Sequence, residues 1–171
     1  MFLLWYFILY SFLGFLLEVV FARVIGHPKK DRKCLLLLPL CPVYGLGALL
    51  IRFLAGLRPG ALWVMVSGFV GATAAEFAVG AFCRSVLRVE FWDYSGMRWN
   101  VGGLVCLQFS LCWAVLALAL VYGADPLLVP LIRSIPAWLD PPAAILLASD
   151  MAVSAAALRR AGTTEVLRWY H

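Results

Sequence analysis

The apolar residues of this chain occur in blocks long enough to cross a membrane, and single carboxylates lie inside these blocks. Residues 1–25 are almost wholly apolar apart from Glu18 and Arg23, and residues 60–83 carry one charge, Glu76. A helix needs about 20 apolar residues to cross the hydrocarbon layer of a bilayer. A charge placed there costs roughly 2.5–3.5 kcal/mol on insertion scales, so it is seldom kept without a use. The pattern predicts a membrane protein whose function depends on a few buried polar groups.

Composition and charge agree with one integral membrane domain over residues 1–171. The chain is 64% hydrophobic and 13% charged, whereas about a quarter of the residues of soluble proteins are charged. The net charge of +5 comes from basic residues at the ends of the apolar blocks rather than from a basic patch. This placement is typical of membrane topology, so we expect the lipid bilayer and not nucleic acid as the partner of these charges.

The blocks predict an all-α, polytopic helix bundle with about five spans, at residues 2–25, 35–57, 60–82, 103–123 and 140–158. Residues 125–140 contain several prolines and are expected to lie along the membrane interface. With five spans, most basic residues fall on one side of the membrane. The positive-inside rule then places the N-terminus outside and the C-terminus in the cytoplasm.

The cysteines and histidines do not have the spacing of a metal site. None of the five cysteines forms a C-x-x-C pair, and the chain has two histidines. Structural zinc sites need several such ligands at short spacings. We therefore expect no metal and no cofactor, and we interpret the cysteines as small buried apolar residues.

Three acids fall at similar depths in three predicted spans. At 1.5 Å per residue, Glu18 and Glu76 lie roughly 9–11 Å from the cytoplasmic boundary, and Asp150 lies at about 12 Å. This agreement predicts a shared polar cavity that opens toward the cytoplasm and is lined by Glu18, Glu76 and Asp150. In the alternative interpretation, each carboxylate is protonated or pairs with a neighbour and holds the bundle together.

The second predicted span is interrupted in its cytoplasmic half. Proline removes a backbone donor and clashes with the preceding turn, so a continuous helix is not expected there. Backbone groups that lose their partners in hydrocarbon must face protein or a wet cavity. Broken helices beside intramembrane acids often form solute or ion sites, although a plain proline kink remains the alternative. The candidate lining residues of this stretch are Pro39, Pro42, Tyr44 and Gly45.

A polar and aromatic loop over residues 84–102 is the third candidate site. Asp93 lies in a run of aromatic residues next to the predicted membrane surface. It is expected either to cap the following turn or pair with Arg32 or Arg98, or to close the cavity and dock a cytoplasmic partner. The candidate docking residues are Arg32, Trp92, Asp93, Tyr94 and Asn100.

These motifs resemble those of a known family. The run at residues 39–45, P-L-C-P-V-Y-G, is similar to the P-x-C-P-I-Y-G signature of bacterial integral membrane proteins described as putative ABC-transporter type IV, or CmpB-like. The W-D-Y-S at residues 92–95 and its following Asn, Gly, Cys, Ser and Trp resemble a second block of that family. The resemblance covers roughly residues 5–115, and it implies a multi-pass protein of the bacterial inner (plasma) membrane that is concerned with transport.

The leading functional hypothesis is therefore a permease-type subunit with an acidic intramembrane cavity. The chain has no G-x-x-x-x-G-K-[ST] loop, so coupling to ATP would need a separate ATPase subunit. A chain of this size is expected to work as a homo-oligomer or in a hetero-complex. Two alternatives remain: a structural or regulatory membrane subunit, and a membrane-embedded enzyme that acts on a lipid-linked substrate. The enzyme is less favoured, because no serine–histidine pair or metal cluster is evident.

Overall fold

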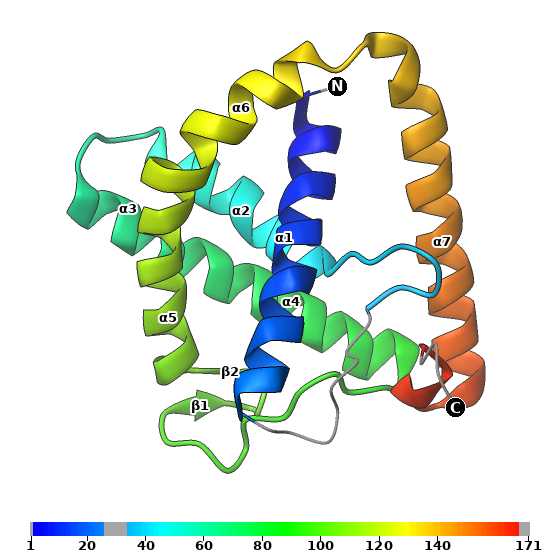
Figure 1. The fold of residues 1–171 in the computed structure, drawn as a ribbon. Helices are drawn as coiled ribbons and strands as arrows, with labels where there is room; N and C mark the ends of the chain where they lie inside the picture. The colour runs from blue at the N-terminus through cyan, green and yellow to red at the C-terminus, as the bar shows by residue number, and fades with distance from the viewer. Residues whose placement is uncertain (1, 26–33, 168–171) are drawn as a thin grey trace.

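The computed structural model describes residues 2–25 and 34–167, and it confirms an all-α fold of the kind that forms helical membrane bundles (Figure 1). Four of its helices are long and apolar enough to cross a membrane, and a fifth is apolar but shorter. The long ones are Phe2–Val24, Ala61–Leu87, Leu107–Ser134 and Ala137–Ala161, and the shorter one is Pro42–Ala55.

Three of the long helices are composite. The first of these joins α3 (Ala61–Ser67), the π-helical segment η1 (Gly68–Ala72), α4 (Thr73–Phe82) and a second π-helical segment η2 (Cys83–Leu87). The next joins α5 (Leu107–Leu118), the π-helical η3 (Ala119–Ala124) and α6 (Asp125–Ser134). The last consists of a 3-10 turn η4 (Ala137–Leu139) and α7 (Asp140–Ala161), and the short η5 (Thr164–Leu167) follows it. The remaining elements are α1 (Phe2–Ile25), α2 (Pro42–Ala55) and a hairpin of β1 (Asn100–Val101) and β2 (Val105–Cys106).

The second predicted span, 35–57, is broken as expected. Residues 34–41 form a non-helical segment, which we call the strap, and α2 begins only at Pro42. Proline suits the first turn of a helix, because its fixed φ angle fits and its missing N–H would have no partner there. The strap leaves the bundle toward α7 and returns to the start of α2 (Figure 1).

The first two helices approach each other closely because glycine lies at two of their contacts. A Cβ atom on Gly14 of α1 would lie within 2.2 Å of the Tyr44 ring, and one on Gly45 of α2 within 2.2 Å of the Ser11 hydroxyl. Such distances exclude any larger side chain unless the helices separate. The pair is therefore set at a spacing that brings Tyr44 against α1.

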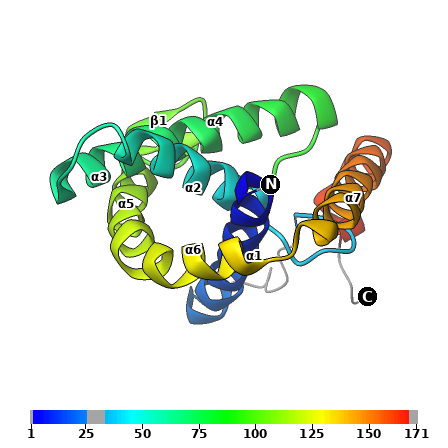
Figure 2. The ribbon, with the colours of Figure 1, turned by 90° about the horizontal axis from the view of Figure 1, so that it is seen from above.

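The predicted interface segment 125–140 contains α6 and η4. Beyond η3 the chain bends, and α6 runs across the end of the bundle at which α1 begins (Figures 1 and 2). There Ile132 of α6 is buried with Tyr6, Tyr10 and Ala48. The chain then turns down into α7, which lies apart from α5 on the other side of α1.

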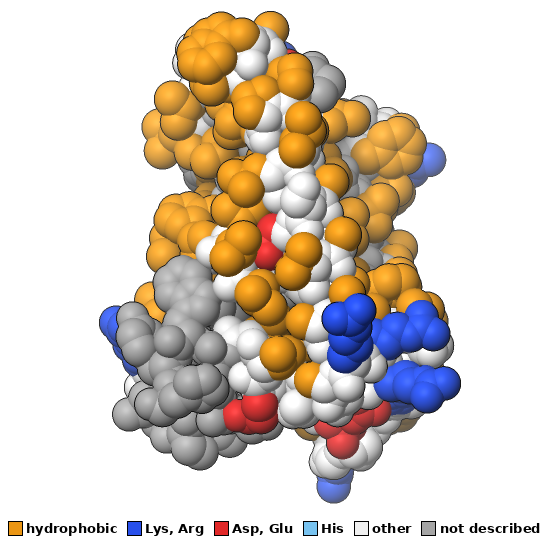
Figure 3. Space-filling model, turned by 90° about the vertical axis from the view of Figure 1, so that its right-hand side faces the viewer, with side chains coloured by type: hydrophobic (Ala, Val, Ile, Leu, Met, Phe, Trp, Pro, Cys, Tyr) orange, Lys and Arg blue, Asp and Glu red, His pale blue; other side chains and the backbone are white. Residues whose placement is uncertain are grey.

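Apolar side chains cover much of the outward face of α7, and basic side chains gather at its lower end (Figure 3). Arg159 and Arg160 lie in its last turn. This distribution fits a helix that crosses a bilayer and ends at a charged surface. Leu158 of α7 packs with Cys83 and Leu87 of η2, which joins the lower end of α7 to the bundle.

Candidate functional site

Side chains from four helices and one loop meet in a group that we call the acid–aromatic cluster: Glu18, Tyr44, Glu76, Tyr94 and Trp113. The Tyr44 hydroxyl donates a hydrogen bond of 2.7 Å to Glu18 Oε1. The Tyr94 hydroxyl donates to Glu76 Oε1 at 2.9 Å, and the Trp113 indole N–H donates to Glu76 Oε2 at 3.1 Å. The rings of Tyr44 and Trp113 lie 5.0 Å apart between centroids, so aromatic contacts join the two carboxylates.

Each member reaches the cluster from a different element. Glu18 comes from α1 and is half-buried, whereas Glu76 in α4 is only 5% exposed. Trp113, from α5, is buried, and it packs in the core with Ile51 and Ala72. Five separate segments thus converge on a polar site inside an otherwise apolar bundle.

The cluster can hold or exchange a proton, and it can attract a cation. An ionised carboxylate only accepts hydrogen bonds, whereas a protonated one also donates, and an ionised pair inside a bundle attracts positive charge. The faces of aromatic rings also attract cations. Burial, and then the neighbouring Glu76 carboxylate, raise the pKa of Tyr94, so its hydroxyl keeps its proton and acts as a donor.

Asp150, the third predicted acid, does not join this cluster. It is 1% exposed, and its Oδ2 accepts hydrogen bonds from the backbone N–H groups of Leu38 at 2.7 Å and Leu37 at 3.3 Å. Its Oδ1 accepts from Leu37 N–H and from the Ser154 hydroxyl, each at 3.1 Å. The Ser154 oxygen in turn accepts from the N–H of Leu36 at 2.8 Å. Asp150 and Ser154 of α7 therefore hold the backbone of the strap.

The strap and the start of α2 lead from α7 to the cluster. The N–H of Cys41 donates to the carbonyl of Ser11 in α1 at 2.9 Å, so the strap is also bound to α1. Pro39 lies inside the strap, and Pro42 starts the helix that presents Tyr44. Gly45 lies against α1 rather than in the cluster, and its role in lining a cavity stays a prediction.

A pocket lies between the lower part of α4 and the loop that connects α4 with α5, and neither Glu18 nor Glu76 lines it. Its lining residues are Gly80, Cys83, Glu90, Phe91, Trp92 and Leu104. A cavity at the acid–aromatic cluster therefore also stays a prediction. Among residues 2–25 and 34–167, no group of three or more histidine, cysteine or acidic side chains is placed to hold a metal ion.

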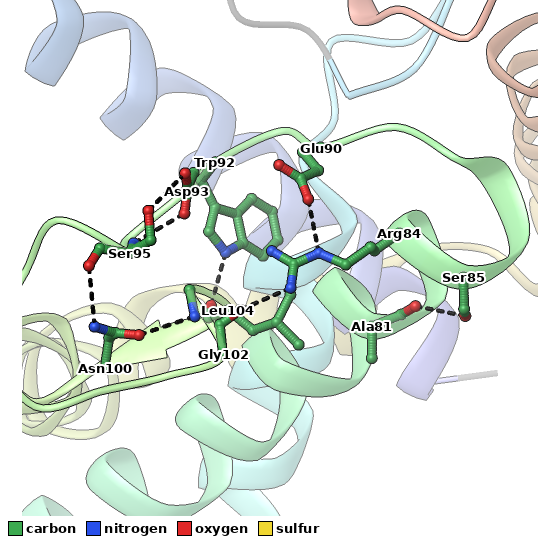
Figure 4. Close-up of polar contacts among 11 residues, drawn as sticks. Ala81, Arg84, Ser85, Glu90, Trp92, Asp93, Ser95, Asn100, Gly102 and Leu104 are labelled. Carbon is green, nitrogen blue, oxygen red and sulfur yellow. Dashed lines mark hydrogen bonds and ion pairs between the residues drawn. The ribbon is translucent and has the colours of Figure 1, made fainter.

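The loop between α4 and α5 is tied together by its own polar groups (Figure 4). Asp93 accepts hydrogen bonds from the N–H of Ser95 at 2.8 Å and from its hydroxyl at 2.9 Å. These bonds lower the pKa of Asp93. The Asn100 amide donates to the carbonyls of Ser95 and Met97, and its oxygen accepts from Gly103 N–H.

One bond joins the two ends of this loop, and Arg84 attaches the loop to η2 (Figure 4). The Trp92 indole donates to the carbonyl of Leu104 at 2.8 Å. Arg84 of η2 forms an ion pair with Glu90 at 2.7 Å and donates to the carbonyl of Gly102 at 2.6 Å. Four of the predicted docking residues thus lie in one ordered loop, while Arg32 lies outside the described residues.

Sequence reasoning missed a second polar group, the Asp125 network, which consists of Tyr6, Tyr10, Arg52 and Asp125. Asp125 Oδ1 accepts hydrogen bonds from the hydroxyls of Tyr6 at 2.9 Å and Tyr10 at 2.7 Å. Its Oδ2 forms an ion pair with Arg52 Nη1 at 2.6 Å. We expected Asp125 in an interface segment because of the prolines that follow it. The sequence feature that could have indicated this network is a lone arginine, Arg52, inside an apolar block.

The fold and this site define a class: a polytopic helical membrane protein with carboxylates buried between its helices. The sequence model of the family described as "Putative ABC-transporter type IV" matches residues 5–157. The chain belongs to this family, as the motifs in residues 39–45 and 92–113 indicated, and it is a transport-related membrane protein. Separate searches found no match among curated proteins and none among solved structures.

Proposed function

We propose that this chain is the permease-type subunit of a transport system in the plasma membrane and that its acid–aromatic cluster lines the transport route. The observation that carries the proposal is the convergence of Glu18 and Glu76 from separate helices on one group of aromatic donors. Carboxylates at such depth in a membrane are costly and mark solute, ion or proton pathways by default. The family description supports transport in particular.

The ordered loop supports a further element of the proposal, which is a separate ATPase subunit that docks there. Tyr94 links the loop directly to Glu76, and Asp93 and Asn100 fix the loop around it. A partner that displaced the loop would therefore change the hydrogen bonding of a cluster carboxylate. Co-purification in mild detergent with mass spectrometry of bound proteins would identify such a subunit. If the subunit no longer co-purifies with the Asp93→Ala variant, this supports docking at the loop.

The experiment that tests the route compares Glu18→Gln and Glu76→Gln with the unchanged protein. Uptake and efflux of a panel of small solutes are measured by mass spectrometry in cells that lack or carry the chain. We expect both variants to lose at least tenfold in the flux that depends on the chain. Glu165→Gln is the matched control, since Glu165 is exposed in the short turn η5. Unchanged flux in both cluster variants at equal protein level contradicts the proposal.

A structural or regulatory subunit is the second candidate, and the hydrogen bonding of Glu76 favours it. Both oxygens of Glu76 already have donors, as expected for a carboxylate that holds helices together. In that case Trp113→Phe, which removes one donor, would destabilise the protein by about 1–3 kcal/mol without a specific effect on flux. If the cluster lines a transport route instead, Trp113→Phe lowers the flux at matched protein level as well as the stability.

A further inference from the structure

The Asp125 network and the acid–aromatic cluster are carried by the same two helices. Tyr10 and Glu18 lie eight residues apart on α1, and Arg52 and Tyr44 lie eight residues apart on α2. At 1.5 Å per residue, each separation is about 12 Å along the helix axis. The α1–α2 pair therefore presents one polar group toward each of its two ends. The cluster faces α4, α5 and the loop, and the network faces α6.

The element that the network holds is α6, which lies across the end of the bundle (Figures 1 and 2). Asp125 is its first residue and directly follows the π-helical segment η3. Short π-helical segments inside helices are frequent at functional sites, and Pro126, the second residue of α6, has no N–H to donate back into η3. The connection between η3 and α6 is thus a place where the helix can change its direction.

The bonds to Asp125 are of the kind that can open and close. One carboxylate takes three donors, two hydroxyls from α1 and a guanidinium from α2. The guanidinium carbon of Arg52 lies 5.2 Å from the centre of the Phe2 ring and 5.3 Å from that of Tyr6. The Arg52 side chain is 34% exposed, so the ion pair reaches the surface of the molecule rather than being sealed in the core.

We propose that the Asp125 network is a gate. While Asp125 is bound to α1 and α2, α6 closes the end of the bundle at which α1 begins. When the network breaks, α6 swings away at η3 and the acid–aromatic cluster becomes accessible from that side. The inference rests on the proposed function, because a gate needs a route, but its test does not depend on transport.

The test uses Cys41 as the reporter, because this buried cysteine directly precedes α2 and its carbonyl accepts a hydrogen bond of 3.0 Å from the N–H of Tyr44, a cluster residue. A membrane-impermeant maleimide is added to right-side-out and to inverted membrane vesicles, and the modification rate of Cys41 is read by peptide mass spectrometry. A protease-cleavable tag before Met1 shows which vesicles expose the end at which α1 begins. The gate variant is Asp125→Asn, which keeps the size of the side chain and removes its charge.

Trp5→Phe is the matched control. It removes the 2.7 Å bond from the Trp5 indole to Asp140, a bond that also involves α1 but not the network. We expect Asp125→Asn to speed the labelling of Cys41 at least tenfold from the side of α6 and less than twofold from the opposite side. The exchange of the two charges, Arg52→Asp with Asp125→Arg, should return the rate toward that of the unchanged protein.

Two results overturn the gate. One is labelling in Asp125→Asn within twofold of the Trp5→Phe rate. The other is an equal increase from both sides of the membrane, which indicates general loosening of the bundle. If Asp125→Asn does not fold, Tyr10→Phe removes one donor with less disturbance and is expected to speed labelling severalfold from the same side only. A flux test that fails while the one-sided labelling holds overturns the proposed route and not the mobility of α6.

Discussion

Replacement of Asp150 by asparagine should release the strap from α7. The carboxylate accepts from two backbone N–H groups of the strap and from the Ser154 hydroxyl, and it is almost fully buried. Asparagine keeps one acceptor oxygen but turns the other into an NH₂ group. With its oxygen at the Oδ1 position, asparagine faces the N–H of Leu38 with a donor, and this amide loses its partner. With its oxygen at the Oδ2 position, Leu37 keeps only the longer of its two bonds and the Ser154 hydroxyl loses its acceptor.

The magnitude follows from these contacts. A buried donor left without a partner costs about 1–3 kcal/mol, and hydrogen bonds to a charged group contribute about 1.5–3 kcal/mol each. Since asparagine retains part of the set, we expect Asp150→Asn to lower the free energy of unfolding by about 2–4 kcal/mol. Asp140→Asn is the control on the same helix. Asp140 accepts one side-chain bond, from Trp5, and asparagine can still accept it, so we expect a loss of at most about 1 kcal/mol.

The assay is reversible unfolding by sodium dodecyl sulfate in mixed micelles, followed by tryptophan fluorescence, together with amide hydrogen exchange. In Asp150→Asn the amides of residues 36–38 should exchange faster, while those in the middle of α5 should not change. Two results would refute the reasoning: a change in stability below about 0.5 kcal/mol, or unchanged exchange of these three amides. Either would mean that the contacts between α7 and the strap do not hold it in place.

Two further predictions concern the α1–α2 contact and the loop. Gly14→Ala places a methyl group against the Tyr44 ring, and we expect it to destabilise the protein by about 1–3 kcal/mol. Gly56→Ala is the control, because its Cβ would make only ordinary contacts, and it should cost less than about 0.5 kcal/mol. Equal effects of the two variants in the same unfolding assay would contradict the close approach of α1 and α2. The pKa of Asp93 is lowered by its bonds to Ser95, so these bonds stabilise the loop above the unfolded pKa of about 3.9 and are lost as the pH falls through the lower folded value. Nuclear magnetic resonance of the Ser95 amide should therefore show an unchanged chemical shift from pH 8 to about pH 5 and a change only on stronger acidification, and a transition above pH 5 would count against it.

Much of the fold could be predicted because the bilayer imposes simple rules on composition. The break in the second span follows from Pro39 and Pro42, since proline cannot continue a helix in the membrane. The ends of the helices were harder to predict from the sequence. The third predicted span stops at residue 82, whereas the helix continues through η2 to Leu87. Its last turns pack against Leu158 of α7, which no local pattern reveals.

The site could be predicted only in part, because the sequence gives the depth of each acid in the membrane but not the direction in which its side chain points. The depth estimate placed Glu18, Glu76 and Asp150 on one level, and the structure brings the first two into one cluster. Asp150 lies on a helix that stands apart from α5, and its carboxylate meets the strap instead. Depth along a helix does not determine which neighbour a side chain faces. That choice depends on the rotation of each helix and on where the strap folds back.

The amino-acid sequence by itself determined that this protein is a helical membrane bundle with carboxylates inside its spans and a break before Tyr44. These properties depend only on runs of consecutive residues, because a span must match the hydrocarbon thickness and proline interrupts the helix at its own position. The tertiary structure alone decided that Tyr44 meets Glu18, that Asp150 holds the strap, and that Asp125 joins α6 to α1 and α2. Each of these contacts joins separate elements, the last two across more than 70 positions, so packing of the whole bundle selects them.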